Sequence, residues 1–103
     1  MNLDLENFRL RSIKEIKEQS KLLRDLISTI DSLNLDLYII GSVLDRKKFN
    51  ENSDVDLAVV TDANYKVRWK IVQVLQKVPF EFGTLDVSIF DSDLEIKGKR
   101  IKL

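Results

Sequence analysis

Two short apolar segments, separated by a polar loop, constrain the fold of this chain more than any other feature. Residues 35–40 are rich in β-forming side chains and almost entirely apolar, which is typical of an inner strand. Residues 54–60 alternate in character, so the two aspartates at their start leave the same face of a second strand. Gly41 and Ser42 end the first strand. The order predicts two strands joined through a glycine–serine turn and a polar loop.

An amphipathic helix is predicted before these strands. Apolar residues recur at spacings of three, four and seven between residues 13 and 33, which is typical of one buried helix face. Ser12 and Glu15 match a capping box that would begin this helix, and Asn34 suits its C-terminal end. Residues 2–11 mix charged and apolar side chains, and we expect a short helical turn there.

A second helix is predicted after the second strand. Residues 63–78 carry an apolar stripe, Asp62 is a suitable N-cap, and Pro79 stops the helix. Trp69 lies beside this stripe, and we interpret it as a core residue rather than as one that stacks on a nucleotide. Two further strands are expected, at residues 84–90 and 100–103.

Composition excludes several classes of protein. The length predicts one domain, 1–103, with a single core. Lys+Arg and Asp+Glu balance at 17 each, which argues against a general attraction to nucleic acid. Without cysteine or histidine, thiolate metal sites and Ser–His or Cys–His catalysis are excluded, and carboxylates remain as proton acceptors. Because no apolar run could span a bilayer and no signal-peptide pattern begins the chain, we expect a cytoplasmic protein without a membrane partner.

Three aspartates form the candidate site. Asp54 and Asp56 leave one face of the second strand, and Asp86 interrupts the apolar third strand. Because adjacent strands lie roughly 5 Å apart, a third strand beside the second would bring these acids together. Gathered carboxylates repel each other, and Mg²⁺, which also takes phosphate oxygens, relieves that repulsion. The other interpretation is structural, with the three acids acting as a turn cap, an edge residue and a salt-bridge partner.

Gly41 and Ser42 are the candidate phosphate-binding residues. Glycine lets the backbone approach a ligand closely, and the serine adds a hydroxyl. The basic run at residues 46–48 follows in the loop. Its charges are either phosphate contacts or the ordinary charge of an exposed loop, and both remain open. Phe49 is predicted to pin this loop to the body of the protein.

The pattern of a strand, Gly-Ser, a loop, Ser-Asp-x-Asp-Leu and a later strand aspartate resembles the DNA polymerase beta-like nucleotidyltransferase superfamily. More narrowly, it resembles the minimal nucleotidyltransferases (MNT), the antitoxins of HEPN/MNT toxin–antitoxin systems. The resemblance covers about residues 35–90. It implies an α/β fold of the α+β type, in which a mixed sheet is flanked by helices. The core would be helix–strand–helix–strand, with the N-terminal helix packed on the sheet.

The same resemblance assigns an activity and residues. The activity is Mg²⁺-dependent transfer of AMP from ATP to a hydroxyl, with two Mg²⁺ ions during catalysis. Asp54 and Asp56 match the metal ligands, and Asp86 matches the third acid, which completes the metal site and helps to activate the hydroxyl. The residues matched to nucleotide or phosphate binding are Gly41, Ser42, Arg46 and Ser53. The loop is one residue longer than usual, and Arg46 stands for the family arginine in a shifted register.

Three functions are compatible with these residues. In the first, the chain transfers AMP to a tyrosine or other hydroxyl of a HEPN-type helical toxin, because so short a chain has little material for an acceptor domain of its own. In the second, it is a catalytically inactive module that neutralises or scaffolds its partner by binding alone. In the third, it is a subunit that acts with an acceptor-binding chain on a small molecule or on RNA. The helix at residues 12–33 could also support a homodimer or heteromer.

Overall fold

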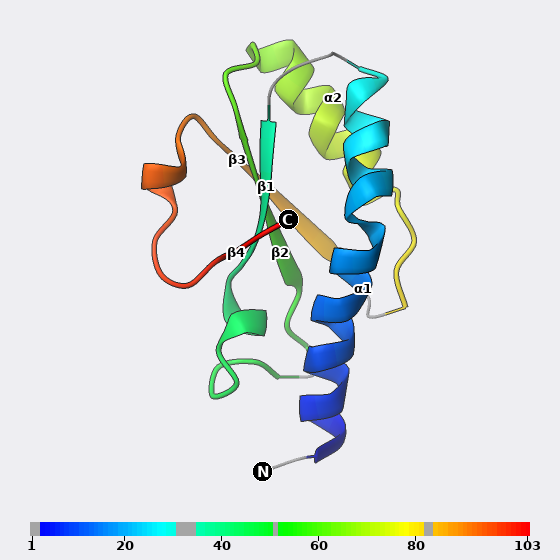
Figure 1. The fold of residues 1–103 in the computed structure, drawn as a ribbon, viewed down its shortest axis with the longest axis vertical. Coiled ribbons are helices and arrows are strands. Elements are labelled where there is room, and N and C mark those ends of the chain that lie inside the picture. Colours follow the sequence, from blue (N-terminus) through cyan, green and yellow to red (C-terminus); the bar gives the residue numbers. More distant parts are fainter. Residues whose placement is uncertain (1–2, 31–34, 51, 82–83) are drawn as a thin grey trace.

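The computed structural model describes residues 3–30, 35–50, 52–81 and 84–103. Within these ranges the chain forms an α+β structure, as the sequence predicts (Figure 1). Its elements are α1 (Leu3–Ser28), β1 (Leu35–Ile40), β2 (Val55–Thr61), α2 (Tyr65–Gln76), β3 (Leu85–Phe90) and β4 (Ile101–Lys102). Two short 3₁₀ turns are present, η1 at Ser42–Leu44 and η2 at Asp93–Glu95. None of the described helices combines the length and apolar composition that crossing a bilayer requires.

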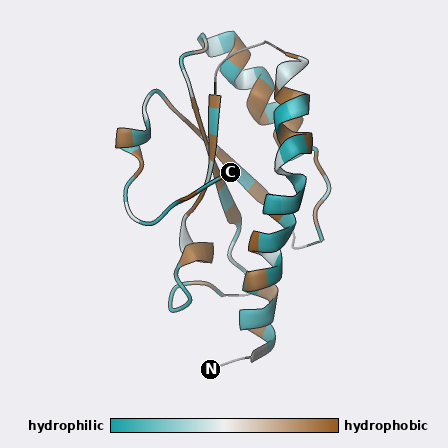
Figure 2. Ribbon diagram, viewed as in Figure 1, coloured by the Kyte–Doolittle hydropathy of each residue, from teal (hydrophilic) through white to brown (hydrophobic). Residues whose placement is uncertain are grey.

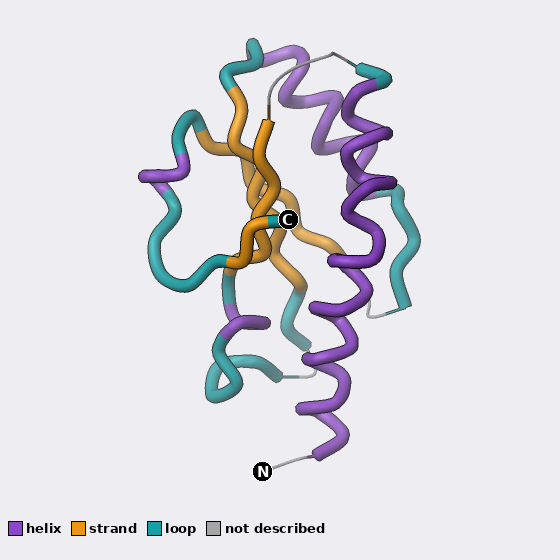
Figure 3. The backbone as a smooth tube through the Cα atoms, in the orientation of Figure 1, coloured by secondary structure: helices purple, strands orange, loops and turns teal. Residues whose placement is uncertain are grey.

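The strands form one mixed sheet in the order β3-β2-β1-β4. Figure 3 shows them in orange, with the helices in purple. β1 pairs antiparallel with both β2 and β4, so it is the inner strand that its apolar sequence predicts. β2 and β3 are parallel, and α2 lies in the crossover between them. The third strand therefore lies beside the second, which is the condition on which the predicted carboxylate site depends.

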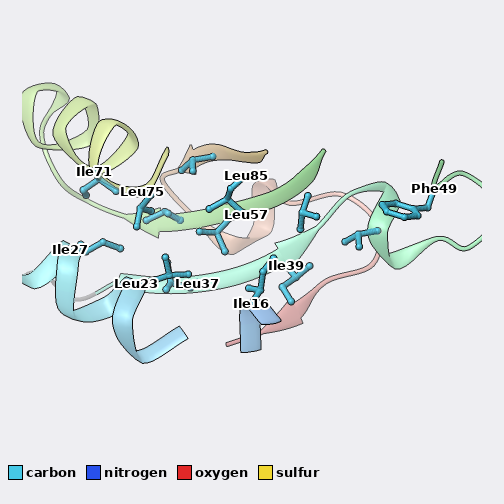
Figure 4. Packing of buried hydrophobic residues seen from close by; sticks show 14 residues of the cluster. Ile16, Leu23, Ile27, Leu37, Ile39, Phe49, Leu57, Ile71, Leu75 and Leu85 are labelled. Carbon is cyan, nitrogen blue, oxygen red and sulfur yellow. The ribbon is translucent and has the colours of Figure 1, made fainter. Parts of the chain in front are cut away.

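Both helices pack on one face of the sheet, with α1 running along its length (Figure 1). Hydrophobic and hydrophilic residues alternate along the helices, as amphipathic helices require (Figure 2). Their apolar side chains meet alternate residues of the central strands in one core (Figure 4). Its fully buried members include Ile16, Leu23, Ile27, Leu37, Ile39, Leu57, Val59, Ile71 and Leu75.

The first helix starts earlier than the sequence predicts. α1 is unbroken across Ser12, so the predicted capping box is wrong, and the helix ends at Ser28 rather than near residue 33. Ser12 is fully buried inside the helix, and its hydroxyl donates to the carbonyl oxygen of Phe8 (2.8 Å). Phe8 stacks on Phe49 with ring centroids 6.2 Å apart, which stabilises the early turns and confirms that Phe49 pins its loop. The predicted cap Asn34 lies outside the described residues.

The second helix begins and ends inside its predicted range. Its N-cap is Asn64, whose side-chain oxygen accepts from the backbone N–H of Val67 (3.1 Å). The prediction of Asp62 as the cap is wrong. The buried Thr61 hydroxyl accepts from the N–H of Ala63 (3.2 Å), and this turn holds the intervening residues outside the helix.

Trp69 is exposed, so the prediction of a core residue is wrong. Its side chain is 58% accessible, and that of Tyr65, one turn earlier, is 83% accessible. The buried residues of α2 are Ile71 and Leu75. Residues two apart on a helix point to nearly opposite sides, so Trp69 faces away from the side that packs on the sheet.

The other face of the sheet is covered by residues 91–100, which we call the β3–β4 connection; it is drawn orange to red in Figure 1. It contains η2, which a capping box stabilises. Ile96 packs against Tyr38 and Ala58 of the sheet. The guanidinium of Arg100 lies over the Tyr38 ring, 5.4 Å from its centroid. The sheet therefore has a helical layer on one face and an irregular segment on the other.

Candidate active site

The acids meet where β2 and β3 begin. Asp54 directly precedes β2, Asp56 is the second residue of β2, and Asp86 is the second residue of β3. Asp56 and Asp86 are register partners in the parallel ladder, so their side chains leave the same face of the sheet next to each other. This face is opposite to the helices, because Val55 and Leu57 point into the helix-side core. The predicted pairing of the second and third strands is confirmed.

Asp56 is an unfavourable place for a negative charge. Burial raises the pKa of Asp56 above its ordinary value, and the negative charges of Asp86 and Asp54 raise it further. A hydrogen bond between the Asp56 and Asp86 side chains adds to the shift. A bound cation would offset the charge of the acidic pair, Asp56 and Asp86, and so stabilise it.

Gly41 borders the acidic pair on the side of β1. Its φ of 84° is a left-handed conformation that residues with a side chain rarely adopt. A Cβ at this position would also collide with the carboxylate of Asp56. The position therefore requires glycine for two independent reasons. Its backbone lies directly against one carboxylate of the pair.

Gly41 and Ser42 border a hollow of about 360 Å³, which we call the glycine–serine hollow. Lysines line its other walls: Lys48 comes from the loop after η1, and Lys97 and Lys99 come from the β3–β4 connection. Leu44, Asp45 and Gly98 complete the lining. The sequence predicts a phosphate site at the turn but gave no reason to include the two C-terminal lysines. The available signal was the run of basic residues around a single glycine near the C-terminus.

Two residues that are expected to bind phosphate lie elsewhere. The Ser53 hydroxyl accepts from the N–H of Asn50 (3.0 Å), and the Ser53 N–H donates to the Asn50 carbonyl oxygen (3.0 Å), so this serine closes its own loop. Arg46 lines a second hollow, of about 870 Å³, together with Arg9 and Lys47. The glycine–serine turn does not border that hollow. Arg46 therefore lines the neighbouring hollow and not the glycine–serine hollow.

In the part of the chain that the structure describes, no three side chains of Asp, Glu, His or Cys form a group arranged to hold a metal ion. The adjoining donors are the oxygens of Asp56 and Asp86, with Asp54 exposed just before them. Mg²⁺ is usually bound through one or two carboxylates together with substrate phosphates and water. A carboxylate pair beside a lysine-lined hollow fits this kind of binding, in which the substrate supplies further ligands.

Comparison of the chain with protein-family models, with curated proteins and with solved structures gives no match in any of the three. Any function must therefore be inferred from the geometry of the chain's own residues. Oxygen donors for a cation and a hollow lined by lysines are both next to Gly41. This arrangement suits a ligand that combines a divalent cation with a chain of phosphates.

Proposed function

We propose that this chain is a minimal nucleotidyltransferase that transfers AMP from ATP, with Mg²⁺, to a hydroxyl of a partner protein. The observation that carries the proposal is that the acidic pair adjoins Gly41 through Asp56, and that Gly41 also borders the lysine-lined glycine–serine hollow. Phosphoryl transfer needs the cation, the phosphates and the attacking hydroxyl to be held next to one another. The mixed sheet, with α2 in the crossover between its parallel strands, is compatible with the nucleotidyltransferase fold.

Each site residue has a role that follows from its position. Asp56 and Asp86 would hold Mg²⁺ together with phosphate oxygens, and the nearby charge of Asp54 would strengthen the attraction for the cation. The cation would offset the charge of the phosphates and align them. The backbone of Gly41 and the hydroxyl of Ser42 would donate to phosphate oxygens, since no side chain at Gly41 separates the turn from the ligand. The exposed Asp86 would accept the proton of the attacking hydroxyl. At the same time, the oxygen of that hydroxyl would form a bond to the α-phosphorus. The bond from that phosphorus to the bridging oxygen of the β-phosphate breaks, and pyrophosphate leaves.

The acceptor in this proposal is a tyrosine or other hydroxyl of a HEPN-type helical toxin, which makes the chain an antitoxin. One observation supports an acceptor that is itself a protein. Asp54 and Asp86 are exposed at the start of their strands, so a side chain of another protein can reach the acids directly. A pocket enclosing a small acceptor is not needed.

Intact-mass spectrometry of a co-expressed partner tests the transfer. The partner to test is the product of an adjacent reading frame, where that frame encodes a small helical protein. We expect wild type, with Mg²⁺ and ATP, to add the mass of AMP to it, and the Asp54→Asn, Asp56→Asn variant to add nothing. Asp62→Asn is the matched control, because this exposed carboxylate lies beyond the other end of β2. A partner that stays unmodified with wild type contradicts the proposed transfer.

Neutralisation by binding alone is the second candidate function, and α2 provides the observation that favours it. Tyr65 and Trp69 are exposed one turn apart on this helix, on the side of the sheet opposite to the acidic pair. Exposed aromatic side chains are common anchors of protein interfaces. Partner neutralisation that survives Asp54→Asn, Asp56→Asn but is lost in Tyr65→Ala, Trp69→Ala would favour this function over transfer.

A further inference from the structure

The glycine–serine hollow is built from two segments that are far apart in the sequence. One wall is the turn at Gly41 and Ser42, and another is the segment Lys97-Gly98-Lys99. Gly98 has a φ of 83°, so the chain turns between the two lysines in a conformation that favours glycine. A Cβ built at Gly98 would meet no atom within 4 Å. Glycine is therefore favoured at this position by the backbone conformation and not by lack of space for a side chain.

Contacts on both sides hold the 97–99 segment against the sheet. Before it, Ile96 is buried against Tyr38. After it, Arg100 lies over the same ring and donates to the carbonyl oxygen of Asp93 (2.6 Å). The chain then enters β4, which pairs with β1. The two lysines thus lie on a short turn that is anchored at both ends, which reduces the entropy lost when they bind a ligand.

The charge of the glycine–serine hollow favours an anion. Three lysines line it, and among its described lining residues Asp45 is the one carboxylate. The Asp45 side chain already accepts from the backbone N–H of Lys47 (3.0 Å). Gly41 borders the hollow and also lies close to the carboxylate of Asp56. A ligand that spans both parts carries a cation at the acidic pair and an extended anion at the lysines.

We infer that the glycine–serine hollow binds a polyphosphate chain, with Lys97 and Lys99 as its cationic ligands in the place expected for Arg46. Arg46 lines the neighbouring hollow, whereas Lys99 lines both. The inference rests on the proposed function and deepens it, because the polyphosphate would be the triphosphate of ATP. Lys97 and Lys99 would then hold the two phosphates that leave as pyrophosphate. An ammonium group offers each phosphate three donors and a full positive charge.

Titration with tripolyphosphate, in the absence of nucleotide and Mg²⁺, separates the hollow from the acidic pair. Calorimetry at an ionic strength of about 0.15 M, where the screening length is about 8 Å, compares wild type with Lys97→Ala, Lys99→Ala. Both side chains are exposed, so the variant should fold, and circular dichroism checks this. We expect binding to weaken about tenfold or more, because two charge-assisted contacts are lost.

Two further variants remove the same charge elsewhere. Arg46→Ala, Lys47→Ala tests the rival assignment in the neighbouring hollow, and Lys66→Ala, Lys70→Ala on α2 controls for net charge. We expect each of these to weaken binding less than about threefold, since distant exposed charges are screened. Equal weakening in all three variants, or no binding by wild type, overturns the inference.

The proposed function fails in a different way. The Asp54→Asn, Asp56→Asn variant should keep its affinity for tripolyphosphate, because it leaves the lysines unchanged, and it should lose Mg²⁺-dependent binding of ATP. If ATP binding does not depend on these acids while the lysine effect remains, the enzyme proposal fails and the polyphosphate site stands. If ATP binding depends on the acids but the lysine variant binds like wild type, the polyphosphate site fails and the enzyme proposal stands.

Discussion

The two faces of the sheet are covered in different ways. On the helix face, two helices and three strands form a continuous core whose members, such as Leu37 and Leu57, are fully buried. On the other face, a smaller cluster forms where Ile96 of the β3–β4 connection packs on Tyr38 and Ala58. Within the described residues this connection contains a 3₁₀ turn and no α-helix.

This difference explains how one sheet can be both stable and acidic. A helix over the starts of β2 and β3 would exclude water, and the acids there would be costly to ionise. The β3–β4 connection instead leaves Asp86 exposed and Asp56 half-buried. The helix face thus supplies most of the stability, and the incomplete second layer leaves room for the site.

Identical substitutions at neighbouring positions of β2 test this comparison most sharply. Val59 is fully buried on the helix face, and Val60 is half-buried on the other face. We expect Val59→Ala to lower the free energy of unfolding by about 2–3 kcal/mol, and Val60→Ala by about 1 kcal/mol or less. Urea unfolding measures both values. Equal losses would show that the two faces are packed alike.

The next effect concerns Gly41, which lies between the glycine–serine turn and Asp56 on the face of the sheet opposite to the helices. Gly41→Ala places a Cβ in a left-handed conformation and against the Asp56 carboxylate, which we expect to cost about 1–3 kcal/mol. Gly98→Ala is the matched control, because it has a similar φ of 83° and open space around it. Its cost should be only the backbone strain, about 1 kcal/mol. Thermal unfolding compares the two variants, and equal costs would mean that the contact with Asp56 has no effect on stability.

The acidic pair should lower the stability of the folded chain at neutral pH. The pKa of Asp56 is higher in the folded chain than in the unfolded chain. The protonated carboxyl therefore contributes fully to the free energy of unfolding at pH values below the pKa of the unfolded chain. This contribution is lost as the pH rises through the pKa of the folded chain. Without metal at neutral pH, Asp56→Asn should therefore stabilise the fold, by less than about 1 kcal/mol because the site is partly solvated. Thermal unfolding at neutral and acid pH measures this gain.

A control and a second readout accompany this prediction. The gain from Asp56→Asn should disappear at acid pH, and Mg²⁺ should raise the melting temperature of wild type but not of the variant. Asp62→Asn, at the other end of β2, is the control for a general change of charge. A gain that persists at acid pH would point to packing rather than to charge as its cause.

The strands and the acidic pair could be predicted from the sequence because simple periods encode them. The apolar runs gave the bounds of the first three strands to within one residue. The side-by-side position of Asp56 and Asp86 follows once two parallel strands are neighbours. Helix ends were predicted less well, because caps were chosen by residue type. Ser12 and Asp62 are suitable caps in isolation, but packing and a neighbouring turn decide where the helices start.

The two C-terminal lysines that line the glycine–serine hollow could not be predicted, for a different reason. Lys97 and Lys99 reach the glycine–serine turn through the packing of Ile96 and the pairing of β4 with β1. No local pattern encodes a contact between segments so far apart in the chain. The same limit applies to Arg46, whose position in the motif suggests phosphate binding but whose loop directs it to a different hollow.

The smallest effect is expected at Trp69, on the outer side of the helix layer. Because it is 58% accessible, Trp69→Ala should change the free energy of unfolding by less than about 0.5 kcal/mol. Ile71→Ala, two residues later on the buried side, should cost about 2–5 kcal/mol. Urea unfolding compares the two variants, and similar losses of unfolding free energy would show that Trp69 is packed in the core. If Trp69→Ala is as stable as wild type but no longer binds the partner, the outer surface of the helix layer is an interface, separate from the acids on the opposite face of the sheet.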